Sequence, residues 1–189
     1  MSAPRILGLS TIHDGWARYH IATVQLPDGT RLEREIEDHG AAVAVLPYDP
    51  ARRVALLVRQ LRTPVLYAAG ADTVLEAPAG VLEHEAPVDG ARRELFEEVG
   101  IRLAALEPAG LTWTMPGIST ERMHLFLAAY TSADRTGAGG GLDSEHENIA
   151  VEEETLASLA ARADAGRLDD MKTLVLVQTL RLRRPDLFG

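Results

Sequence analysis

Extended runs near the start of the chain predict a β-hairpin. Residues 16–26 and 31–38 have the mixed apolar and polar pattern of strands, and the triplet Pro27-Asp28-Gly29 lies between them. A Pro-Asp-Gly triplet between two extended runs is a turn signal. Two β-rich runs, residues 41–46 and 54–59, follow, and the first is apolar throughout, as a central strand is. The chain therefore begins with sheet-forming segments.

The remainder of the chain combines helices with strands. The run from Pro87 to Val99 predicts a helix that Gly100 ends, because proline is favoured in the first turn and glycine just after the last. A loop around residues 68–72 precedes this helix. The pattern further predicts strands at residues 102–106, 110–114 and 123–130, a flexible Gly139-Gly140-Gly141 break, and helices at residues 155–165 and 169–182.

Length and composition favour one globular domain. The chain has 189 residues, of which 46% are hydrophobic and 25% charged, so it can bury a core. The formal net charge of −9 argues against nucleic acid or a membrane surface as a partner. We find no internal repeat, no apolar run long enough to cross a membrane, and no linker that divides the chain. A cytoplasmic protein is expected.

Several kinds of chemistry are excluded by the residues themselves. The chain has no cysteine, which rules out disulfides, thiolate nucleophiles and cysteine-based metal sites. It also lacks an H-E-x-x-H zinc pattern, a G-x-S-x-G elbow and a P-loop. A surplus of carboxylates, with 28 acidic against 19 basic residues, is compatible with a cation site that holds a phosphate-containing substrate.

A cluster of carboxylates lies near the end of the predicted helix 87–99. Glu94 and Glu98 are four residues apart and share a helix face, with Glu97 beside them. Negative charge at a helix C-terminus opposes the helix dipole, and such conflicts are expected at functional sites. A divalent cation such as Mg²⁺ would remove the repulsion. The alternative is a solvated acidic face on which Arg93 pairs with Glu97.

The sequence around these carboxylates resembles the Nudix box, G-x5-E-x7-R-E-U-x-E-E-x-G-U, in which U is aliphatic. From Glu85 through Arg93-Glu94-Leu95-Phe96-Glu97-Glu98-Val99-Gly100-Ile101, every fixed position matches. The one departure is that four residues, not five, separate Gly80 from Glu85. The resemblance implies an α/β fold, a Nudix α/β/α sandwich with a mixed sheet and an N-terminal β-hairpin extension. It also implies metal-dependent cleavage of a diphosphate that joins a nucleoside to another group.

Site roles follow from this resemblance residue by residue. Glu94 and Glu98 would ligate Mg²⁺, for which Mn²⁺ could substitute, and the carbonyl of Ala79 would complete the metal shell. Glu97 would ligate the metal ion or orient its ligands. Arg93 would orient the glutamates, and Glu85 would be mainly structural. A late acidic loop would supply Glu145 as a further metal ligand and catalytic carboxylate, with Glu147 as the alternative.

The chain is further similar to the GDP-mannose hydrolase and ADP-ribose pyrophosphatase branch of the Nudix family. The similarity rests on the hairpin, Arg59-Gln60-Leu61-Arg62, Glu76-Ala77-Pro78-Ala79-Gly80, Pro116-Gly117 and the late acidic loop. The shortened spacing after Gly80 and the run 138–141 favour the GDP-mannose hydrolases. This likeness implies a Nudix domain at residues 41–189 and a homodimer. In this dimer, residues 1–40 of each subunit would cross to the partner subunit.

The same branch suggests which residues contact substrate. Trp16 would stack on the base, Arg34 and Glu35 would reach the base or ribose, and Arg62 would clamp phosphate. Glu121 could hold a second cation or a sugar hydroxyl, and Lys172 would contact substrate, with Ala79 and Gly80 lining the same site. The structural alternatives are packing of Trp16 at a dimer surface, a cross-strand pair of Arg34 and Glu35, and surface positions for the others.

Three functions remain to be distinguished. The first is a Mg²⁺-dependent diphosphatase that converts a nucleoside diphosphate sugar, GDP-mannose being favoured, to a nucleoside monophosphate and a sugar 1-phosphate. The second is an ADP-ribose pyrophosphatase. The third is a binding module that senses a nucleotide sugar without hydrolysing it. The presence of Glu94, Glu97 and Glu98 favours an enzyme.

Overall fold

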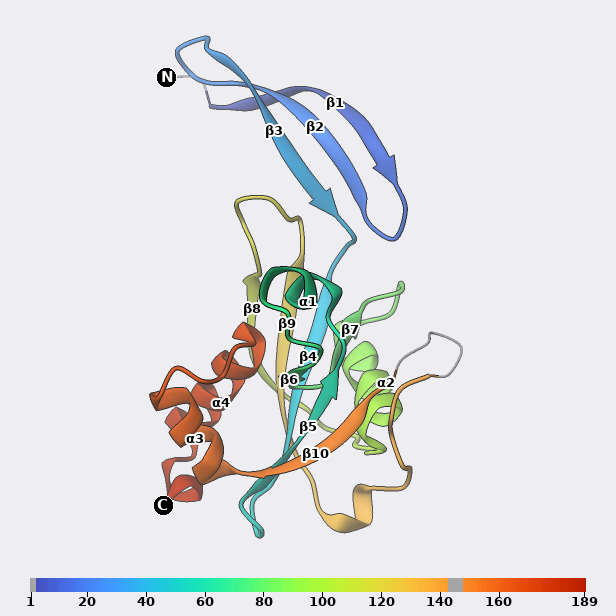
Figure 1. Cartoon of the computed structure of the whole chain (residues 1–189), viewed down its shortest axis with the longest axis vertical. Coiled ribbons are helices and arrows are strands. Elements are labelled where there is room, and N and C mark those ends of the chain that lie inside the picture. Colours follow the sequence, from blue (N-terminus) through green and yellow to red (C-terminus); the bar gives the residue numbers. More distant parts are fainter. Residues whose placement is uncertain (1–2, 143–147) are drawn as a thin grey trace. The chain divides into compact units, whose positions relative to one another are not determined.

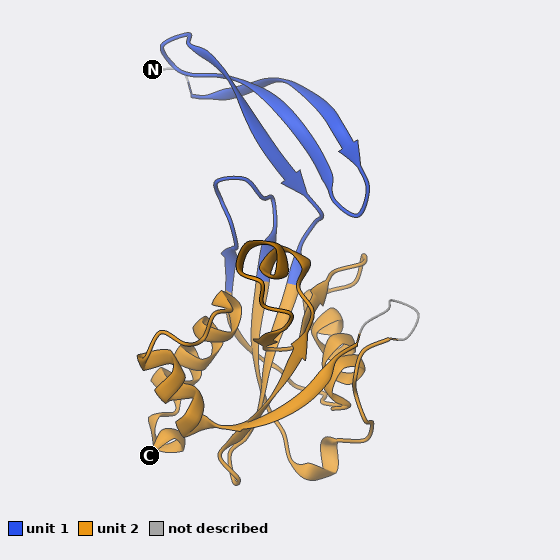
Figure 2. Ribbon diagram, viewed as in Figure 1, with its two compact units in different colours: residues 1–42, 111–123 blue, residues 43–110, 124–189 orange. Residues whose placement is uncertain are grey.

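The computed structural model describes residues 3–142 and 148–189. The chain divides into two compact units, residues 1–42 with 111–123 and residues 43–110 with 124–189, called here unit 1 and unit 2 (Figure 2). Unit 1 therefore groups the N-terminal sheet with the loop that joins two strands of the second sheet. None of the helices in the described ranges is both long and apolar enough to cross a membrane.

Unit 1 contains an antiparallel sheet of order β1-β2-β3 (Figure 1). The predicted hairpin is confirmed as β2 (Arg18–Gln25) and β3 (Arg31–Asp38), in which Ala22 lies opposite Arg34 and Ile21 opposite Glu35. The pattern did not predict β1 (Arg5–Asp14), which pairs with β2 and is exposed along its whole length. An edge strand of this kind lacks the buried apolar face that makes a strand visible in a sequence.

Unit 2 carries a seven-stranded mixed sheet, whose main path is β10-β5-β4-β9-β8. Short strands β6 and β7 pair with β5 and β4 at one end. The strands are β4 (Ala42–Asp49), β5 (Val54–Gln60), β6 (Val74–Glu76), β7 (Ala79–Val81), β8 (Glu107–Trp113), β9 (Arg122–Ala129) and β10 (Ala150–Thr155). The helices are α1 (Thr63–Ala69), α2 (Pro87–Val99), α3 (Leu156–Asp164) and α4 (Met171–Arg183), with 3₁₀ turns η1 (Ser132–Asp134) and η3 (Pro185–Phe188).

Helices cover both faces of this sheet, which gives the predicted α/β/α layering (Figure 1). The core on one face joins strand residues such as Val45 and Val58 to Ala91, Leu95 and Val99 of α2. Alternate strand residues point to the opposite face, where α3 and α4 lie. Packing of its apolar stripe against the sheet holds α2 in place, so the polar side chains of α2 have fixed positions.

Two local expectations are wrong. Residues 102–106 form no strand; Ile101 makes an isolated bridge to Arg135, and Leu103 and Leu106 pack against the core as parts of a loop. The expected loop at 68–72 is partly helical, because α1 begins with a proline in its first turn and ends at Gly70 in the left-handed conformation. Both errors concern short segments whose conformation is set by packing.

Candidate active site

The carboxylates of α2 lie against strand β7. Glu94 and Glu98 have exposed fractions of 8% and 1%, and Glu98 Oε2 accepts a hydrogen bond of 3.1 Å from the backbone N–H of Ala79. Burial of two charged groups is unfavourable unless they are paired or bind a cation. The alternative of a solvated acidic face is therefore wrong for these two glutamates.

Gly80 leaves room for Glu94. A Cβ atom at this position would overlap with the carboxylate of Glu94, so a residue with a side chain could not occupy position 80 unless Glu94 moved. The close approach of a strand backbone to a buried carboxylate brings the neighbouring carbonyl of Ala79 into the same region. The structure thus brings together Ala79, Gly80, Glu94 and Glu98, as predicted.

Arg93 donates hydrogen bonds to three carboxylates of the box. Its guanidinium donates to Glu85 Oε1 at 2.8 Å, to Glu94 Oε1 at 2.7 Å and to Glu97 Oε2 at 3.0 Å. The hydrogen bond to Glu85 and the charges around it raise the pKa of Arg93 above its ordinary value, so this guanidinium is a permanent cation. Glu85 reaches Arg93 despite the shortened spacing after Gly80.

The C-terminus of α2 is closed by the glycine run. The backbone N–H groups of Gly140 and Gly141 donate to the carbonyl oxygens of Glu98 and Glu97 at 2.9 and 3.1 Å. Carbonyls of the last helical turn have no partner within the helix, and donors supplied from outside offset the partial negative charge there. This contact explains how several glutamates can be tolerated at the unfavourable end of a helix.

Arg62 and Lys172 meet at a buried carboxylate. Arg62 Nε and Nη2 donate to the two oxygens of Glu76 at 2.8 and 3.0 Å, and Lys172 Nζ donates to Glu76 Oε2 as well. Lys172 Nζ also donates to Asp170 Oδ1 at 3.0 Å. Burial opposes the ionisation of Glu76, but Arg62 and Lys172 outweigh it and hold its pKa below the ordinary value. Lys172 is therefore no surface cation, and Arg62 pairs with a buried partner.

Unit 1 contains the other predicted substrate residues. Trp16 is 79% exposed and stacks on His39, with ring centroids 4.7 Å apart. His39 Nε2 lies 2.8 Å from Glu121 Oε2, and its Nδ1 lies 2.5 Å from Glu37 Oε1. Burial lowers the pKa of His39, yet hydrogen bonds to the two carboxylates outweigh burial and raise it. Trp16 and Glu121 are thus linked through the imidazole ring of His39.

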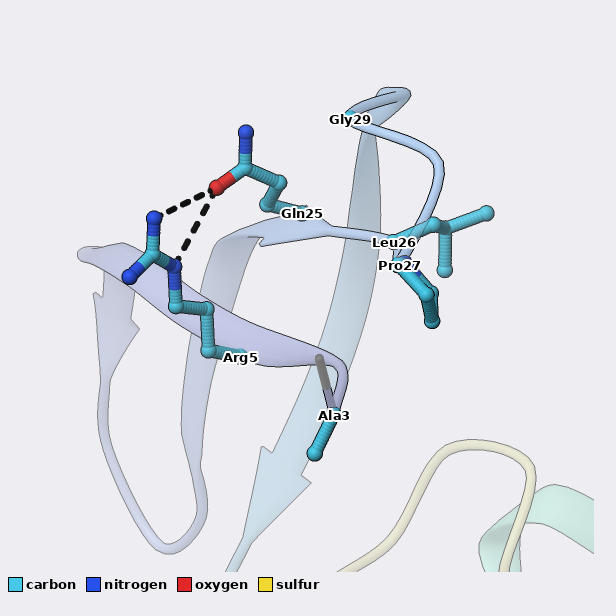
Figure 3. Close-up of a pocket in the computed structure, with 6 residues that line it drawn as sticks. All are labelled: Ala3, Arg5, Gln25, Leu26, Pro27 and Gly29. Atoms are coloured by element: carbon cyan, nitrogen blue, oxygen red, sulfur yellow. Dashed lines mark hydrogen bonds between the residues drawn. The ribbon is translucent and has the colours of Figure 1, made fainter. Parts of the chain in front are cut away.

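Arg34 and Glu35 are exposed neighbours on β3. Arg34 Nη1 donates to the backbone carbonyl of Glu33, and the register places uncharged residues opposite both side chains, so they form no cross-strand ion pair with those residues. Elsewhere in unit 1 a pocket of about 360 Å³ adjoins the hydrogen-bonded side chains of Arg5 and Gln25 (Figure 3). The lining of this pocket includes no predicted site residue.

The donor set of unit 2 suits a hard divalent cation. Glu94, Glu98 and the carbonyl of Ala79 supply oxygen, which Mg²⁺ prefers, and the space at Gly80 keeps the strand close to the carboxylates. Within residues 3–142 and 148–189, no group of three or more His, Asp or Glu side chains is arranged to hold a metal ion. Glu145 and Glu147, the predicted late carboxylates, lie outside the described residues.

Sequence reasoning missed Glu76, Asp170 and His39. Glu76 and Asp170 are partners of predicted residues, and 96 positions separate Glu76 from Lys172. Glu76 belongs to a run that resembles the family, but the run itself gives it no role, and its local pattern is only a charged residue at the end of an otherwise apolar segment, Val74–Glu76. Such a residue needs a partner in the interior, but the sequence does not say which one.

Comparison with known proteins agrees with this site. Residues 38–172 match the NUDIX domain model, which covers more than half of the chain, and the chain belongs to the Nudix family of hydrolases. Enzymes of this family generally need a divalent metal ion.

Among individual relatives, a GDP-mannose pyrophosphatase of Cronobacter sakazakii is 38% identical over 81% of this chain and 80% of its own length. A GDP-mannose pyrophosphatase of Pectobacterium atrosepticum is 33% identical over 97% of each chain. A solved structure described as an ADP compounds hydrolase has a TM-score of 0.79 and 18% identity, covering 98% of this chain and 96% of that one, and it supports the fold alone.

Proposed function

We propose that this protein is a Mg²⁺-dependent diphosphatase that hydrolyses GDP-mannose to a nucleoside monophosphate and a sugar 1-phosphate. The observation that carries the proposal is the pair of buried carboxylates, Glu94 and Glu98, against Ala79 in a chain similar to GDP-mannose pyrophosphatases over 80% or more of its length. A module that only binds nucleotide sugars would not need these buried carboxylates.

Each residue of the site has a definite task in this proposal. Glu94, Glu98 and the Ala79 carbonyl would hold Mg²⁺, which neutralises diphosphate charge and lowers the pKa of a bound water. Arg93 keeps Glu94 and Glu97 in place from one side. Arg62 and Lys172 would contact the diphosphate, because a guanidinium can bind two phosphate oxygens at once. Glu145, or Glu147 as its alternative, would act as the late catalytic carboxylate.

Unit 1 would recognise the nucleoside. The exposed ring of Trp16 offers a stacking face for a base, and Arg34 and Glu35 offer hydrogen-bonding groups on an exposed strand. We further propose a homodimer in which residues 1–40 serve the Nudix domain, residues 41–189, of the partner subunit. A cytoplasmic location completes the proposal and fits the absence of cysteine.

The decisive experiment is a substrate panel with and without Mg²⁺. Phosphate monoesters released from GDP-mannose, GDP-glucose, ADP-ribose, ADP-glucose and UDP-glucose are measured after a phosphatase coupling step. We expect strong Mg²⁺-dependent turnover of GDP-mannose above all others. Preferred turnover of ADP-ribose would replace the substrate, and no turnover by folded protein across the panel would favour the binding module.

A further inference from the structure

Four charged side chains of unit 2 form one group: Arg62, Glu76, Asp170 and Lys172. Glu76 is the least exposed of them. Its exposed fraction is 2%, and it lies at the end of β6, where it is the residue opposite Val58 of β5. A lone carboxylate at such a position would be costly, but Arg62 and Lys172 both donate to it. The strand therefore fixes the carboxylate, and the carboxylate fixes two cations that come from different parts of the chain.

The geometry leaves donors on both cations. Arg62 uses Nε–H and one N–H of Nη2 for Glu76, which leaves three of its five guanidinium N–H groups not used by that carboxylate. Lys172 gives one N–H to Glu76 and one to Asp170, which leaves a third. One carboxylate can therefore hold an arginine and a lysine side by side while both still offer N–H groups to an anion.

The position of Lys172 is unfavourable for helix stability alone. It lies in the first turn of α4, where the helix dipole disfavours a cation. Asp170 caps this helix by accepting from the backbone N–H of Thr173, and Thr173 Oγ1 accepts from the backbone N–H of Ala77 at 2.6 Å. The start of α4 is thus tied to Ala77, which follows Glu76 and lies two residues before Ala79, so Lys172 is held beside the end of β6, in the segment that leads to Ala79.

We propose that Glu76 is a positioning residue that sets Arg62 and Lys172 as a paired binding site for the diphosphate of the substrate. The inference rests on the proposed function, because that function requires a diphosphate at the neighbouring Nudix carboxylates. Glu76 offsets the repulsion between the two cations and orients them, and it does not itself touch the substrate. Two hydrogen bonds connect the pair to the Nudix carboxylates: the backbone N–H of Ala77, next to Glu76, donates to Thr173 beside Lys172, and the backbone N–H of Ala79 donates to Glu98.

The test compares Glu76→Gln with the wild-type protein by two readouts. The first is kcat/KM for GDP-mannose, and the second is the affinity for inorganic pyrophosphate measured by calorimetry. We expect both to fall about tenfold or more, since the amide keeps the shape but loses the charge that orders both cations. Glu153→Gln is the matched control, because Glu153 accepts two hydrogen bonds from Arg52 on the exposed surface of unit 2 and has no role in the proposed site. It should leave both quantities unchanged.

A mutant cycle separates positioning from a merely structural role. In a background of Arg62→Gln and Lys172→Gln, adding Glu76→Gln should weaken pyrophosphate binding less than about twofold, because no cations remain to be positioned. An equal loss in both backgrounds, or unchanged affinity of folded Glu76→Gln protein, overturns the proposal. If Glu76→Gln does not fold, Glu76→Asp, which keeps the charge but shortens the reach, replaces it under the same criteria.

Pyrophosphate binding also distinguishes this proposal from the proposed function. If the wild-type protein hydrolyses none of the panel but binds pyrophosphate in a Glu76-dependent way, the assigned reaction fails and the positioning role stands. If it hydrolyses GDP-mannose and Glu76→Gln changes neither readout, the reaction stands and the positioning role fails.

Discussion

The carboxylate of Glu98 is 1% exposed and accepts its hydrogen bond from the backbone of β7. Glu98→Gln keeps the size of the side chain and an oxygen that can accept from Ala79, so the fold should persist. One negative charge is lost from the proposed metal site, and we expect kcat to fall about 100-fold or more. Steady-state kinetics with a circular dichroism control measures this, and turnover near that of the wild type would remove Glu98 from the mechanism.

The substitution Gly80→Ala, which adds one methyl group, should affect activity more than stability. Gly80→Ala would push a Cβ against the Glu94 carboxylate, which is the movable end of a long side chain. We therefore expect a small change in Tm but a fall in kcat of about tenfold or more, because Glu94 must leave its position. Gly189→Ala, where no atom lies within 4 Å of the new Cβ, is the control and should change neither quantity. A fully active Gly80→Ala enzyme would show that Glu94 has no fixed role.

The residues that sequence alone could identify are those whose spacing carries the chemistry. Glu94, Glu97 and Glu98 lie on one helix, so their mutual placement follows from helix geometry. Glu76 could not be found in this way, because its importance comes from Arg62 and Lys172, which reach it from outside β6. His39 was missed for the same reason, since its two carboxylate partners come from β3 and from the loop before β9.

At the scale of elements, helix α2 depends on the glycine that ends it. Gly100 has φ of +74°, and a Cβ there would overlap with the backbone carbonyl of Gly137, which cannot swing away. Gly100→Ala should lower the free energy of unfolding by about 1–3 kcal/mol or more, measured by urea denaturation. Gly166→Ala has a similar φ of +62° but open space around it, so it isolates the conformational strain. Equal losses for both variants would show that the contact with Gly137 does not matter.

Elements with a strong pattern or clear end signals were predictable. Helix α2 was predicted with its observed bounds, since proline, an apolar stripe and glycine mark its start, face and end. The exposed strand β1 and the three-residue strands β6 and β7 gave no comparable signal, because pairing with neighbours defines them. The same limit explains the error at residues 102–106, where leucines that pack on the core resemble a strand.

The end of β3 and the loop before β9 are joined by a histidine whose charge depends on pH. The pKa of His39 is raised above 6.5 in the folded protein, so the folded state binds this proton more tightly than the unfolded chain does. Its stabilisation is complete below about pH 6.5 and is lost as the pH rises through the folded-state pKa. Urea unfolding followed by tryptophan fluorescence should show stability that declines as the pH rises above about 6.5.

Substitution of this histidine provides the control for the pH effect. His39→Gln should lower the stability at pH 6 and remove most of the decline toward pH 9, because the glutamine carries no titrating charge between Glu37 and Glu121. His13→Gln, on the exposed strand β1, should retain the wild-type decline. A His39→Gln variant with the same pH slope as the wild type would assign the decline to other groups.

At the scale of the whole molecule, the predicted site residues fall into both units. The charges that would handle a diphosphate are in unit 2, whereas the aromatic and polar groups proposed for the nucleoside are on the N-terminal sheet and the 111–123 loop (Figure 2). The Pectobacterium relative matches over 97% of this chain, which includes both units. In our proposal, recognition of the nucleoside and hydrolysis of the diphosphate would be carried by separate units of one chain, and the proposed dimer would combine them.

A dimer through the N-terminal sheet should be a requirement for activity. Strand β1 exposes Ile6, Leu9 and Ile12, each more than half exposed at 60%, 56% and 63%, which is the kind of apolar surface that a second copy would cover. The double variant Leu9→Asp and Ile12→Asp should be monomeric by light scattering, because burying two carboxylates at an interface is unfavourable. We expect its KM for GDP-mannose to rise about tenfold or more, since Trp16, Arg34 and Glu35 would no longer reach the partner's site. Leu182→Asp, at an 84% exposed position on α4, controls for added charge and should remain dimeric and active. A monomeric double variant with unchanged KM would show that each subunit completes its own site.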